Sequence, residues 1–335
     1  MLMDMTIKDV AKIAGVSPAT VSRVINGTKP VSEEVTKRVL DAIEKTGFKR
    51  NAAARSLVVK RSNLLGVIIP DISNMYFSEL IKGIDSMAHF YNYNIILSSS
   101  STNENREVEC FNLLLEKGVD GIIFTAYRYV RDPIYKIIDR ASIPFVSLNR
   151  KCRNTISIRV DNTKESYEAT KYLIKLGHRN IAFISGYFDD DASGIQRMDG
   201  YKKALKEYGI PIRQNLICEG DFTFKGGYNG AEKLLMFNKD ITAIFAVNDE
   251  MAYGVMAYIQ DIGLKIPKDI SVMGFDDVAY SQNFRPRLTT VHQPIYDIGE
   301  MASKTIIKAI NEGFREDDII VKGGIAVRES TRRIE

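Results

Sequence analysis

The spacing of apolar residues over the first fifty positions predicts three short helices. Apolar side chains recur three or four positions apart within Thr6–Gly15, Ser17–Gly27 and Ser32–Gly47, which is the repeat of one face of a helix. Each segment opens on a hydroxyl residue that can cap a helix N-terminus and closes on a glycine that can end it. A tight turn joins the first two segments, so the pattern indicates a helix-turn-helix with a supporting third helix.

From residue 64 onward the pattern changes to short apolar runs that alternate with amphipathic segments of helical length. The runs of strand length are Leu64–Pro70, Asn94–Ser98, Gly121–Thr125, Phe145–Leu148, Ile181–Ser185, Ala243–Val247 and Ser271–Phe275. Such alternation is typical of a parallel sheet with crossover helices. The runs form a set of four and a set of three, so the expected fold is multi-domain: an all-α head and an α/β core of two doubly wound parallel-sheet subdomains.

Polar side chains follow several of these predicted strands. Asp71, Thr125 and Asn149 end strands of the first set, and Asn248-Asp249 and Asp276-Asp277 end strands of the second. In open α/β sheets the ligand lies outside the carboxyl ends of the strands, so two facing sheets would line one cleft with acids and amides. These groups exchange hydrogen bonds with hydroxyls, which indicates a polyhydroxylated ligand. The same residue types also cap helices, and at any single position that role is the more common one.

Charge is distributed unevenly between the head and the rest of the chain. Residues 1–62 carry 12 Lys and Arg against six Asp and Glu, whereas the other 273 residues carry 34 against 36. A basic head on a slightly acidic body indicates a polyanionic partner for the head. In Ser17–Gly27 the face away from the valines is small and polar, which suits a helix that enters a major groove. A plain three-helix bundle with a polar surface would show the same helical pattern.

Several classes of protein fit this composition poorly. No apolar run approaches the roughly 18 residues of a membrane span, and the N-terminus lacks the basic region and apolar core of a signal peptide, so we expect a cytoplasmic protein. The three Cys and three His are scattered, so we expect neither a disulfide framework nor a metal or cofactor. A doubly wound sheet also suits dehydrogenases and kinases, but no glycine-rich dinucleotide motif or phosphate-binding loop is present, so we do not expect an enzyme.

The stretch TIKDVAKIAGVSPATVSRVING at Thr6–Gly27 resembles the DNA-binding head of the lactose-repressor/galactose-repressor family of bacterial regulators. The match to the family core V-S-x-x-T-V-S-R-V-x-N is close to complete, and the resemblance continues through the whole chain. It implies a recognition helix from Ser17 to about Asn26. It further implies base readout by Pro18 and Ala19, base or phosphate contacts by Ser22, Arg23 and Asn26, and phosphate positioning by Thr6, Ser17 and Thr20.

The alanine-rich stretch Asn51–Leu57 is only about two turns long, and an isolated helix of that length is marginal in water. It resembles the family's hinge helix, which orders on DNA. The resemblance implies that Leu57 wedges into the minor groove at the operator centre, while Asn51 and Arg55 contact the DNA backbone. The family usually has Pro before this Asn, where the chain has Arg50. Without the resemblance, a simple linker would be the expected role.

The core resembles a periplasmic sugar-binding protein, as in the rest of the family, and this implies an effector site in the cleft. In the motif SGIQRMDGYKKAL at Ser193–Leu205, Arg197 would clamp effector oxygens, with Asp276 as its acidic partner across the cleft. The other implied effector positions are Asp71, Asn74, Tyr76, Phe77, Asn149, Arg150, Ser193, Phe222, Asn248 and Asp249. Asp191 stands where purine-responsive members carry a basic residue, so we expect a sugar or sugar derivative.

Two further stretches, at 76–94 and Val291–Gly299, resemble the catabolite-control branch of the family, which binds a phosphorylated carrier protein of the sugar phosphotransferase system. Two departures argue against it: Arg197 is usually absent there, and Lys304 replaces an Arg whose fork Lys cannot reproduce. We therefore expect a sugar-responsive repressor of carbohydrate-utilisation genes. The alternatives are a catabolite-control regulator activated by a serine-phosphorylated carrier and, from another class, a transport-type sugar-binding protein, which would need an export signal.

The expected domains are a DNA-binding head (1–48), a hinge (49–61) and an effector-binding and dimerisation core (62–335). The family resemblance divides the core into about 62–161 plus 293–322 and about 162–292 plus 323–335. We expect a homodimer on a palindromic operator, because one small helix-turn-helix reads few bases and paired half-sites match a two-fold axis. The chain ends soon after VRESTRR, so we do not expect the C-terminal heptad that makes some family members tetramers.

Overall fold

A computed structural model describes residues 5–26, 29–48, 61–126 and 129–334 of the chain. It separates two compact units, with the boundary between Ser62 and Asn63. The first unit contains the head, and the second contains the α/β core. No helix within the described ranges is both long enough and apolar enough to span a lipid bilayer.

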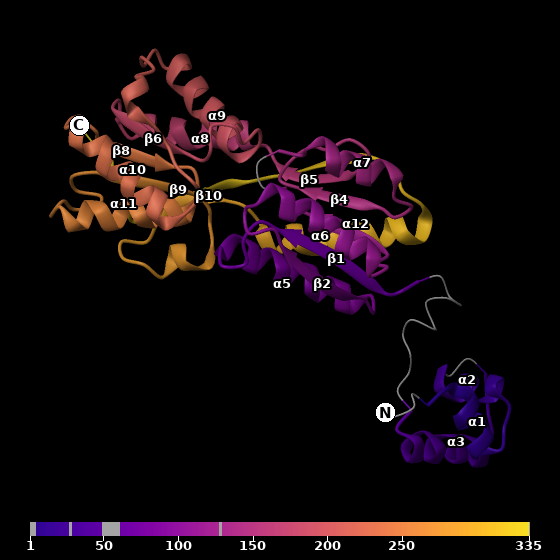
Figure 1. Cartoon of the computed structure of the whole chain (residues 1–335). Coiled ribbons are helices and arrows are strands. Elements are labelled where there is room, and N and C mark those ends of the chain that lie inside the picture. The colour runs from indigo at the N-terminus through magenta and orange to yellow at the C-terminus, as the bar shows by residue number, and fades with distance from the viewer. Residues whose placement is uncertain (1–4, 27–28, 49–60, 127–128, 335) are drawn as a thin grey trace. The chain divides into compact units, whose positions relative to one another are not determined.

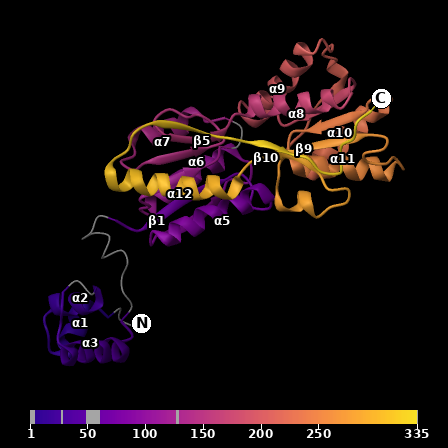
Figure 2. The same cartoon turned by 180° about the vertical axis from the view of Figure 1, so that it is seen from behind.

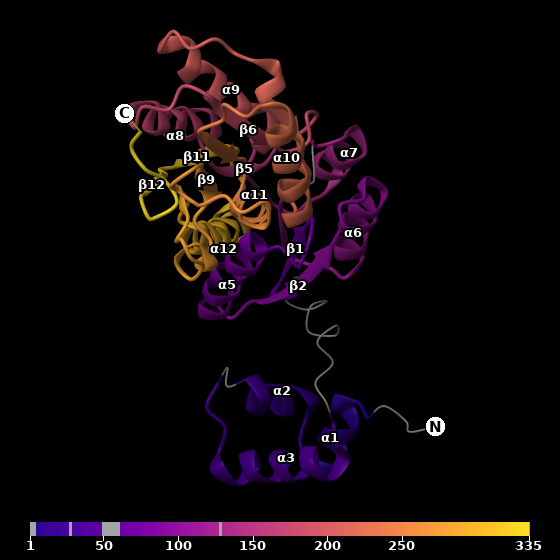
Figure 3. The same ribbon diagram turned by 90° about the vertical axis from the view of Figure 1, so that its left-hand side faces the viewer.

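The head is a three-helix unit built from α1 (Ile7–Ala14), α2 (Pro18–Asn26) and α3 (Glu33–Thr46) (Figure 3). These bounds agree with the helices that the apolar spacing predicts. The three helices share a small apolar core, which buries Val10, Ala11, Ala14, Val21, Val39 and Ala42. A core this small leaves the capping and turn residues an important part in fixing the helix positions.

The helix ends of the head use most of the predicted caps. The backbone N–H of Thr6 donates to Oδ2 of Asp9 at 2.9 Å, which forms the capping box of α1. Gly15 ends α1 in the left-handed conformation at φ 64°, and the Ser17 hydroxyl accepts from the Thr20 N–H at 3.1 Å. Ser32 occupies the N-cap position of α3, but its side chain makes no capping hydrogen bond.

The first sheet of the core is fully parallel, with the order β11-β5-β4-β3-β1-β2. Its strands are β1 (Leu64–Ile69), β2 (Asn94–Ser99), β3 (Gly121–Phe124), β4 (Phe145–Leu148), β5 (Ile156–Val160) and β11 (Asp317–Val321). Helices α5 (Met75–Phe90) and α12 (Ile295–Glu312) pack together on one face, and α6 (Glu104–Glu116) and α7 (Asp132–Arg140) cover the other (Figure 3).

The second sheet has the corresponding order β12-β10-β9-β8-β6-β7, and only β12 pairs antiparallel. Its strands are β6 (Ile181–Ser185), β7 (Ile217–Glu219), β8 (Ala243–Ala246), β9 (Ser271–Asp276), β10 (Thr289–His292) and β12 (Gly324–Ala326). Its helices form two packed pairs: α8 (Asn162–Lys175) with α9 (Ser193–Glu207), and α10 (Phe224–Phe237) with α11 (Asp249–Asp261). Short 3₁₀ turns lie at Gln214–Leu216 (η1) and Ala279–Gln282 (η2).

All seven predicted strands are present, with ends shifted by at most one residue, and the expected fold class is confirmed. Five strands were not predicted: β5, β7, β10, β11 and β12. In β5, Ser157 and Arg159 interrupt the apolar run, yet both side chains have partners inside the protein. Ser157 lies within hydrogen-bonding distance of the Ser147 hydroxyl at 3.0 Å, and Arg159 donates two hydrogen bonds of 2.8 Å to Asp318 of β11.

The chain passes between the two sheets three times: from β5 into α8, from β10 into α12, and from β11 into β12. Figures 1 and 2 show the last part of the chain, in yellow, running from the first subdomain to the second. Each subdomain is therefore completed by a segment that is distant in sequence.

Candidate functional site

Helix α2 of the head has one buried face and one exposed face. Val21 is fully buried, and Val24 and Ile25 pack against the same small core. Among the residues predicted to contact DNA, Thr6, Ser17, Pro18, Ala19 and Arg23 are exposed, and Thr20 and Ser22 are partly buried. The side chain of Asn26, and Asn51, Arg55 and Leu57 altogether, lie outside the described residues.

The exposed face of α2 combines a helix N-terminus with hydroxyl and guanidinium groups. The Ser17 oxygen serves as the N-cap and lies 2.9 Å from the Thr20 hydroxyl. Arg23 forms no ion pair with any residue in the described part of the chain. A helix N-terminus with hydroxyl groups and an exposed guanidinium that forms no ion pair among the described residues suits contact with DNA phosphates and base edges.

A cavity of about 210 Å³ lies between the two subdomains, at the carboxyl ends of strands from both sheets. From the first subdomain it is lined by Pro70, Asp71, Asn74, Tyr76, Phe77, Thr102, Thr125, Ala126, Asn149 and Arg150. From the second it is lined by Tyr187, Asp190, Ser193, Arg197, Asp221, Phe222, Thr223, Asn248, Glu250 and Asp276. Eleven of the twelve residues predicted for the effector site therefore border one cavity.

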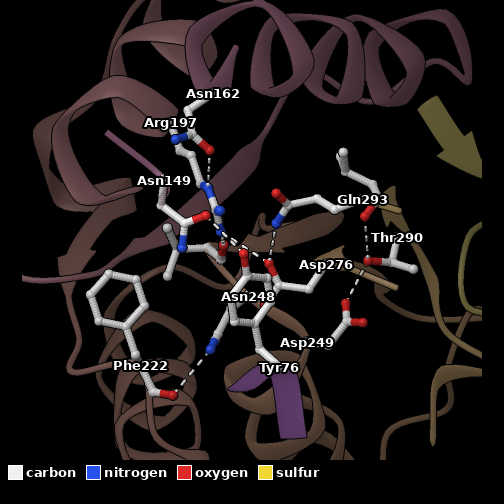
Figure 4. Close-up of polar contacts among 12 residues, drawn as sticks. Tyr76, Asn149, Asn162, Arg197, Phe222, Asn248, Asp249, Asp276, Thr290 and Gln293 are labelled. Atoms are coloured by element: carbon white, nitrogen blue, oxygen red, sulfur yellow. Dashed lines mark hydrogen bonds and ion pairs between the residues drawn. The ribbon is translucent and has the colours of Figure 1, made fainter. Parts of the chain in front are cut away.

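Arg197 is the central cation of the cavity, and the protein holds it on several sides (Figure 4). Its Nε donates to Oδ1 of Asn162 at 2.8 Å, and its Nη1 donates to the Val247 carbonyl at 2.6 Å. Nη1 also lies 3.5 Å from Oδ1 of Asp276, and the guanidinium stands 3.6 Å from the ring centre of Phe275. Within the described residues, Nη2 has no hydrogen-bond partner, so it remains available to a ligand.

Asp276 ends β9 with a backbone φ of 125°, a conformation that costs free energy for any residue other than glycine. Its Oδ1 accepts a hydrogen bond of 2.7 Å from Nε2 of Gln293, which precedes α12. Burial raises the pKa of Asp276 to about 6, against the opposing effect of Arg197. This carboxylate thus connects the cavity to one of the three segments that cross between the subdomains.

Asp249 does not line the cavity, and its predicted place there needs correction. The neighbouring Asn248 caps α11 and lines the cavity, but Asp249 begins the helix and points into the second subdomain. Its two oxygens accept hydrogen bonds from the Thr290 hydroxyl at 2.5 Å and the Val278 N–H at 2.9 Å. Burial, together with the negative charge of Asp276, raises the pKa of Asp249 well above its ordinary value. Asp249 therefore supports the loop after β9 from behind.

The first wall of the cavity is held by a hydrogen bond between Tyr76 and Asn149. The Tyr76 hydroxyl donates to Oδ1 of Asn149 at 2.8 Å (Figure 4), and Asn74 caps α5 by accepting from the Tyr76 N–H at 2.9 Å. Asn149 has a φ of 67° at the end of β4, a conformation that Asn tolerates better than most residues. The start of α5 is thereby joined to the end of β4 at the cavity.

The opposite wall presents the aromatic rings of Phe222 and Tyr187, with their centres 6.0 Å apart. The Phe222 carbonyl accepts from Nδ2 of Asn248 at 3.1 Å (Figure 4). Gly186 makes the ring position possible, because a Cβ atom there would lie 2.0 Å from the Phe222 ring. Tyr187 was not predicted from the sequence, although it lies two residues after the end of β6.

Arg150 joins the two subdomains at the cavity. It leaves the end of β4 in the first subdomain, and its guanidinium lies 3.3 Å from Oδ1 of Asp190 in the second. A second ion pair links it to Asp191. Asp190 is buried and also accepts from the backbone N–H groups of Ala192 at 3.1 Å and Gly194 at 2.9 Å. Asp190 was missed in the sequence, where a run of three aspartates after a strand was the available signal.

A small helical head with an exposed polar helix and a two-subdomain core with a cavity define a ligand-controlled DNA-binding protein. Residues 6–51 match the family described as bacterial regulatory proteins, lacI family. Residues 62–330 match the periplasmic binding proteins and sugar binding domain of LacI family. Because these matches cover most of the chain, the protein belongs to the LacI family, and it is a DNA-binding transcriptional regulator.

Known proteins resemble this chain over nearly its full length. Catabolite control protein A of Priestia megaterium is 41% identical over 333 residues, which cover 98% of this chain and 100% of the relative. The lac repressor dimer bound to operator and the anti-inducer ONPF is 26% identical, with a TM-score of 0.87 over 98% of this chain and 99% of that chain. The CelR–cellobiose complex is 27% identical, with a TM-score of 0.74 over 97% and 99%. The predicted family and fold are confirmed.

Proposed function

We propose that this regulator is a homodimeric repressor of carbohydrate-utilisation genes, and that a sugar or sugar derivative in the cavity controls its affinity for a palindromic operator. The observation that carries the proposal is the single cavity to which both subdomains contribute acids, amides, hydroxyls and aromatic rings. Acids and amides hydrogen-bond to sugar hydroxyls, and aromatic faces cover the C–H patches of a sugar ring. The similarity to a regulator solved with cellobiose supports this choice of ligand.

In the proposed DNA complex, α2 lies in the major groove. Pro18 and Ala19 would read bases, and Ser22, Arg23 and Asn26 would contact bases or phosphates. Hydroxyls of Thr6, Ser17 and Thr20 would position the phosphate backbone, while Asn51, Arg55 and Leu57 would act at the hinge. The solvent exposure of most of these side chains in the head and its excess of basic residues support this arrangement.

Control by a ligand follows from a cavity with two walls. A ligand that touches both subdomains binds the closed core better than the open core, so it shifts the population toward closure. In a dimer, closure changes the distance between the first subdomain of one protomer and the first subdomain of its partner. In each protomer the chain connects this subdomain to the head. Operator affinity and ligand affinity are then coupled reciprocally, typically by about 1–3 kcal/mol.

The second candidate is a catabolite-control regulator whose corepressor is a serine-phosphorylated carrier protein. The full-length identity of 41% to catabolite control protein A supports it. Two residues favour a sugar-responsive repressor instead. Arg197 is present and points a free guanidinium nitrogen toward the cavity, and Lys304, exposed on α12, cannot form the planar two-bond contact of an arginine with phosphate.

Selection of bound sequences from a random DNA pool tests the DNA-binding part of the proposal. At near-physiological salt, contacts to phosphate alone are weak, so enrichment reports base readout. We expect a palindrome with a central CG step. No enrichment, with or without added ligands, would remove the proposed operator recognition.

The recovered operator then serves to compare effectors. Operator affinity of the full-length protein is measured in the presence of sugars and, separately, of the serine-phosphorylated carrier. A change caused by a sugar supports the sugar-responsive repressor. A change caused by the carrier alone establishes the catabolite-control candidate in its place.

A further inference from the structure

The charges that line the cavity are unbalanced. Five carboxylates border it, from Asp71, Asp190, Asp221, Glu250 and Asp276, against only the two guanidinium groups of Arg150 and Arg197. Both cations already have carboxylate partners, because Arg150 pairs with Asp190 and Arg197 with Asp276. The cavity therefore offers an anionic ligand no cation that is not already neutralised.

The excess negative charge belongs to Asp71, Asp221 and Glu250. Asp71 follows β1 of the first subdomain, Asp221 follows β7 of the second, and Glu250 stands in the first turn of α11. None of the three forms an ion pair with a residue in the described ranges. Asp71 and Asp221 each use Oδ1 to accept from a backbone N–H and a hydroxyl two residues on, which leaves Oδ2 for a ligand.

The three carboxylates act on one another electrostatically. Burial raises the pKa of Glu250, and the negative charges of Asp71 and Asp221 raise it further. Like charges that face each other from two subdomains favour separation of those subdomains, unless a cation lies between them. Among the described residues, no group of three acids, cysteines or histidines is arranged to hold a metal ion, so an organic cation is the better match.

Another group in the same cavity requires a ligand with hydroxyls. Thr125 is 5% exposed, and its hydroxyl is buried with no hydrogen-bond partner among the residues described. A buried hydroxyl without a hydrogen-bond partner destabilises the protein. A hydroxyl of the ligand would give the Thr125 hydroxyl a hydrogen-bond partner. A second ligand hydroxyl could accept a hydrogen bond from the free Nη2 of Arg197. The cavity therefore suits a ligand with hydroxyls near Thr125 and Arg197 and with a positive charge near the three acids.

We infer that the effector is an amino sugar, with its protonated amine between Asp71, Asp221 and Glu250. The inference rests on the proposed function, since it specifies the ligand of the same cavity. The same charges disfavour phosphorylated sugars and sugar acids. The ammonium closes the core by pairing with carboxylates from both subdomains, which replaces their repulsion by attraction.

The test compares four charge forms of the same sugars on the full-length protein. Glucose, galactose and mannose are each used unsubstituted, as the 2-amino sugar, as its N-acetyl derivative and as the 6-phosphate. Binding is measured as a shift of the thermal midpoint and then by calorimetry. We expect at least one free-amine sugar to bind more than about tenfold tighter than its three counterparts.

Two variants separate a charge contact from a loss of fold. Glu250→Gln keeps the shape of the side chain, and Glu116→Gln, at an exposed position on α6, removes one charge away from the cavity. We expect Glu250→Gln to weaken binding of the amino sugar by about tenfold or more, and binding of the unsubstituted sugar by less than about twofold. Glu116→Gln should leave the affinities for both sugars unchanged. Affinity for the amine should rise as pH increases above the ordinary Glu pKa and Glu250 ionises, and this rise should be smaller in Glu250→Gln, where only the other acids of the cavity titrate.

The inference is wrong if no free-amine sugar binds, or if a neutral or phosphorylated form binds as tightly as the amine. It is also wrong if Glu250→Gln weakens the amine and the unsubstituted sugar equally. The proposed function has a separate outcome. It stands if a neutral or phosphorylated sugar shifts operator affinity, and it falls if only the carrier protein does so.

Discussion

Arg197 and Asp276 show how single buried residues set the chemistry of the cavity. The guanidinium is fixed by Asn162 and the Val247 carbonyl, so its remaining nitrogen has a defined direction. Asp276 compensates its charge from one side. Removal of either partner would leave an uncompensated buried charge, which costs about 3–5 kcal/mol. Conservative substitutions therefore separate the ligand contact from the stability of the fold.

The first prediction concerns Arg197→Lys. Lysine keeps the positive charge beside Asp276 but cannot maintain the planar set of hydrogen bonds that aims a nitrogen into the cavity. We expect effector affinity to fall by about tenfold or more, with operator affinity unchanged when effector is absent. The matched control is Arg213→Lys, at a surface ion pair with Asp240. Operator titrations with and without effector measure both quantities, and a full effector response in Arg197→Lys would contradict the assigned contact.

A second prediction concerns Gly186→Ala. The new methyl group would occupy the space of the Phe222 ring, so the ring must leave its position on the cavity wall. We expect effector affinity to drop by roughly five- to tenfold with little change in secondary structure, because the displaced ring loses contact with the ligand. Gly324→Ala, where no atom lies within 4 Å of the new methyl, should bind effector normally. Equal effects at both positions would argue against a ligand-contacting ring.

The third prediction is a pH effect of Asp249, whose pKa is raised by burial and by Asp276. The folded protein holds a proton on this carboxyl more tightly than the unfolded chain does. The contribution of Asp249 to stability is therefore fully present below the ordinary Asp pKa of about 4 and is lost as pH rises from there through the raised folded value. Asp249→Asn mimics the protonated form, so its free energy of unfolding should decline less between pH 4 and pH 8.

Urea denaturation at several pH values measures this difference. The exposed Asp199 on α9 provides the control, since Asp199→Asn should retain the wild-type slope. An Asp249→Asn variant that loses stability with pH as steeply as the wild type would show that another group causes the decline.

At the scale of single elements, the predictable parts of the fold are those with an uninterrupted apolar pattern. The three head helices and the seven predicted strands follow from such runs, and the head helices also from Ser, Thr and Gly at their ends. Strands β5 and β11 escape prediction because Arg159 and Asp318, which look like surface residues, pair with each other across the two strands. The sequence predicts which strand ends carry the site residues. It does not separate Asn248, which lines the cavity, from Asp249, which does not, because α11 begins between these two neighbours.

The turn between α1 and α2 gives a prediction about an element rather than a contact. Gly15 has a φ of 64°, where alanine costs roughly 1 kcal/mol or more and asparagine less. We expect Gly15→Ala to weaken operator binding by changing the angle between α1 and α2, and Gly15→Asn to restore most of it. Fluorescence anisotropy with the selected operator measures both. Equal losses in the two variants would mean that backbone conformation is not the cause.

At the scale of the whole molecule, the three crossings join the two subdomains into one folding unit. Each sheet receives its sixth strand after the chain has already passed through the other sheet. One subdomain therefore cannot lose its structure without pulling a strand or a helix from its neighbour. The chain divides into compact units between the head and the core, not between the two sheets.

This leads to a prediction for core unfolding. Ile123→Ala in the first subdomain and Ile184→Ala in the second both remove fully buried side chains, at about 2–5 kcal/mol each. We expect either substitution to move one common transition, followed by far-ultraviolet circular dichroism and by tyrosine fluorescence. Two transitions, each sensitive to only one substitution, would show that the subdomains unfold separately.

The corresponding strand orders of the two sheets and their three shared connections also bear on how such proteins diversify. Each sheet takes its last strand, β11 or β12, from a part of the chain that lies beyond the other subdomain. Recombination that replaces one continuous half of the core by that of a related gene would separate β10 from its neighbour β12. It would also separate α12 from the first sheet, on which it packs. New chemical preferences are therefore more accessible through individual codon changes around the cavity than through shuffling of subdomains.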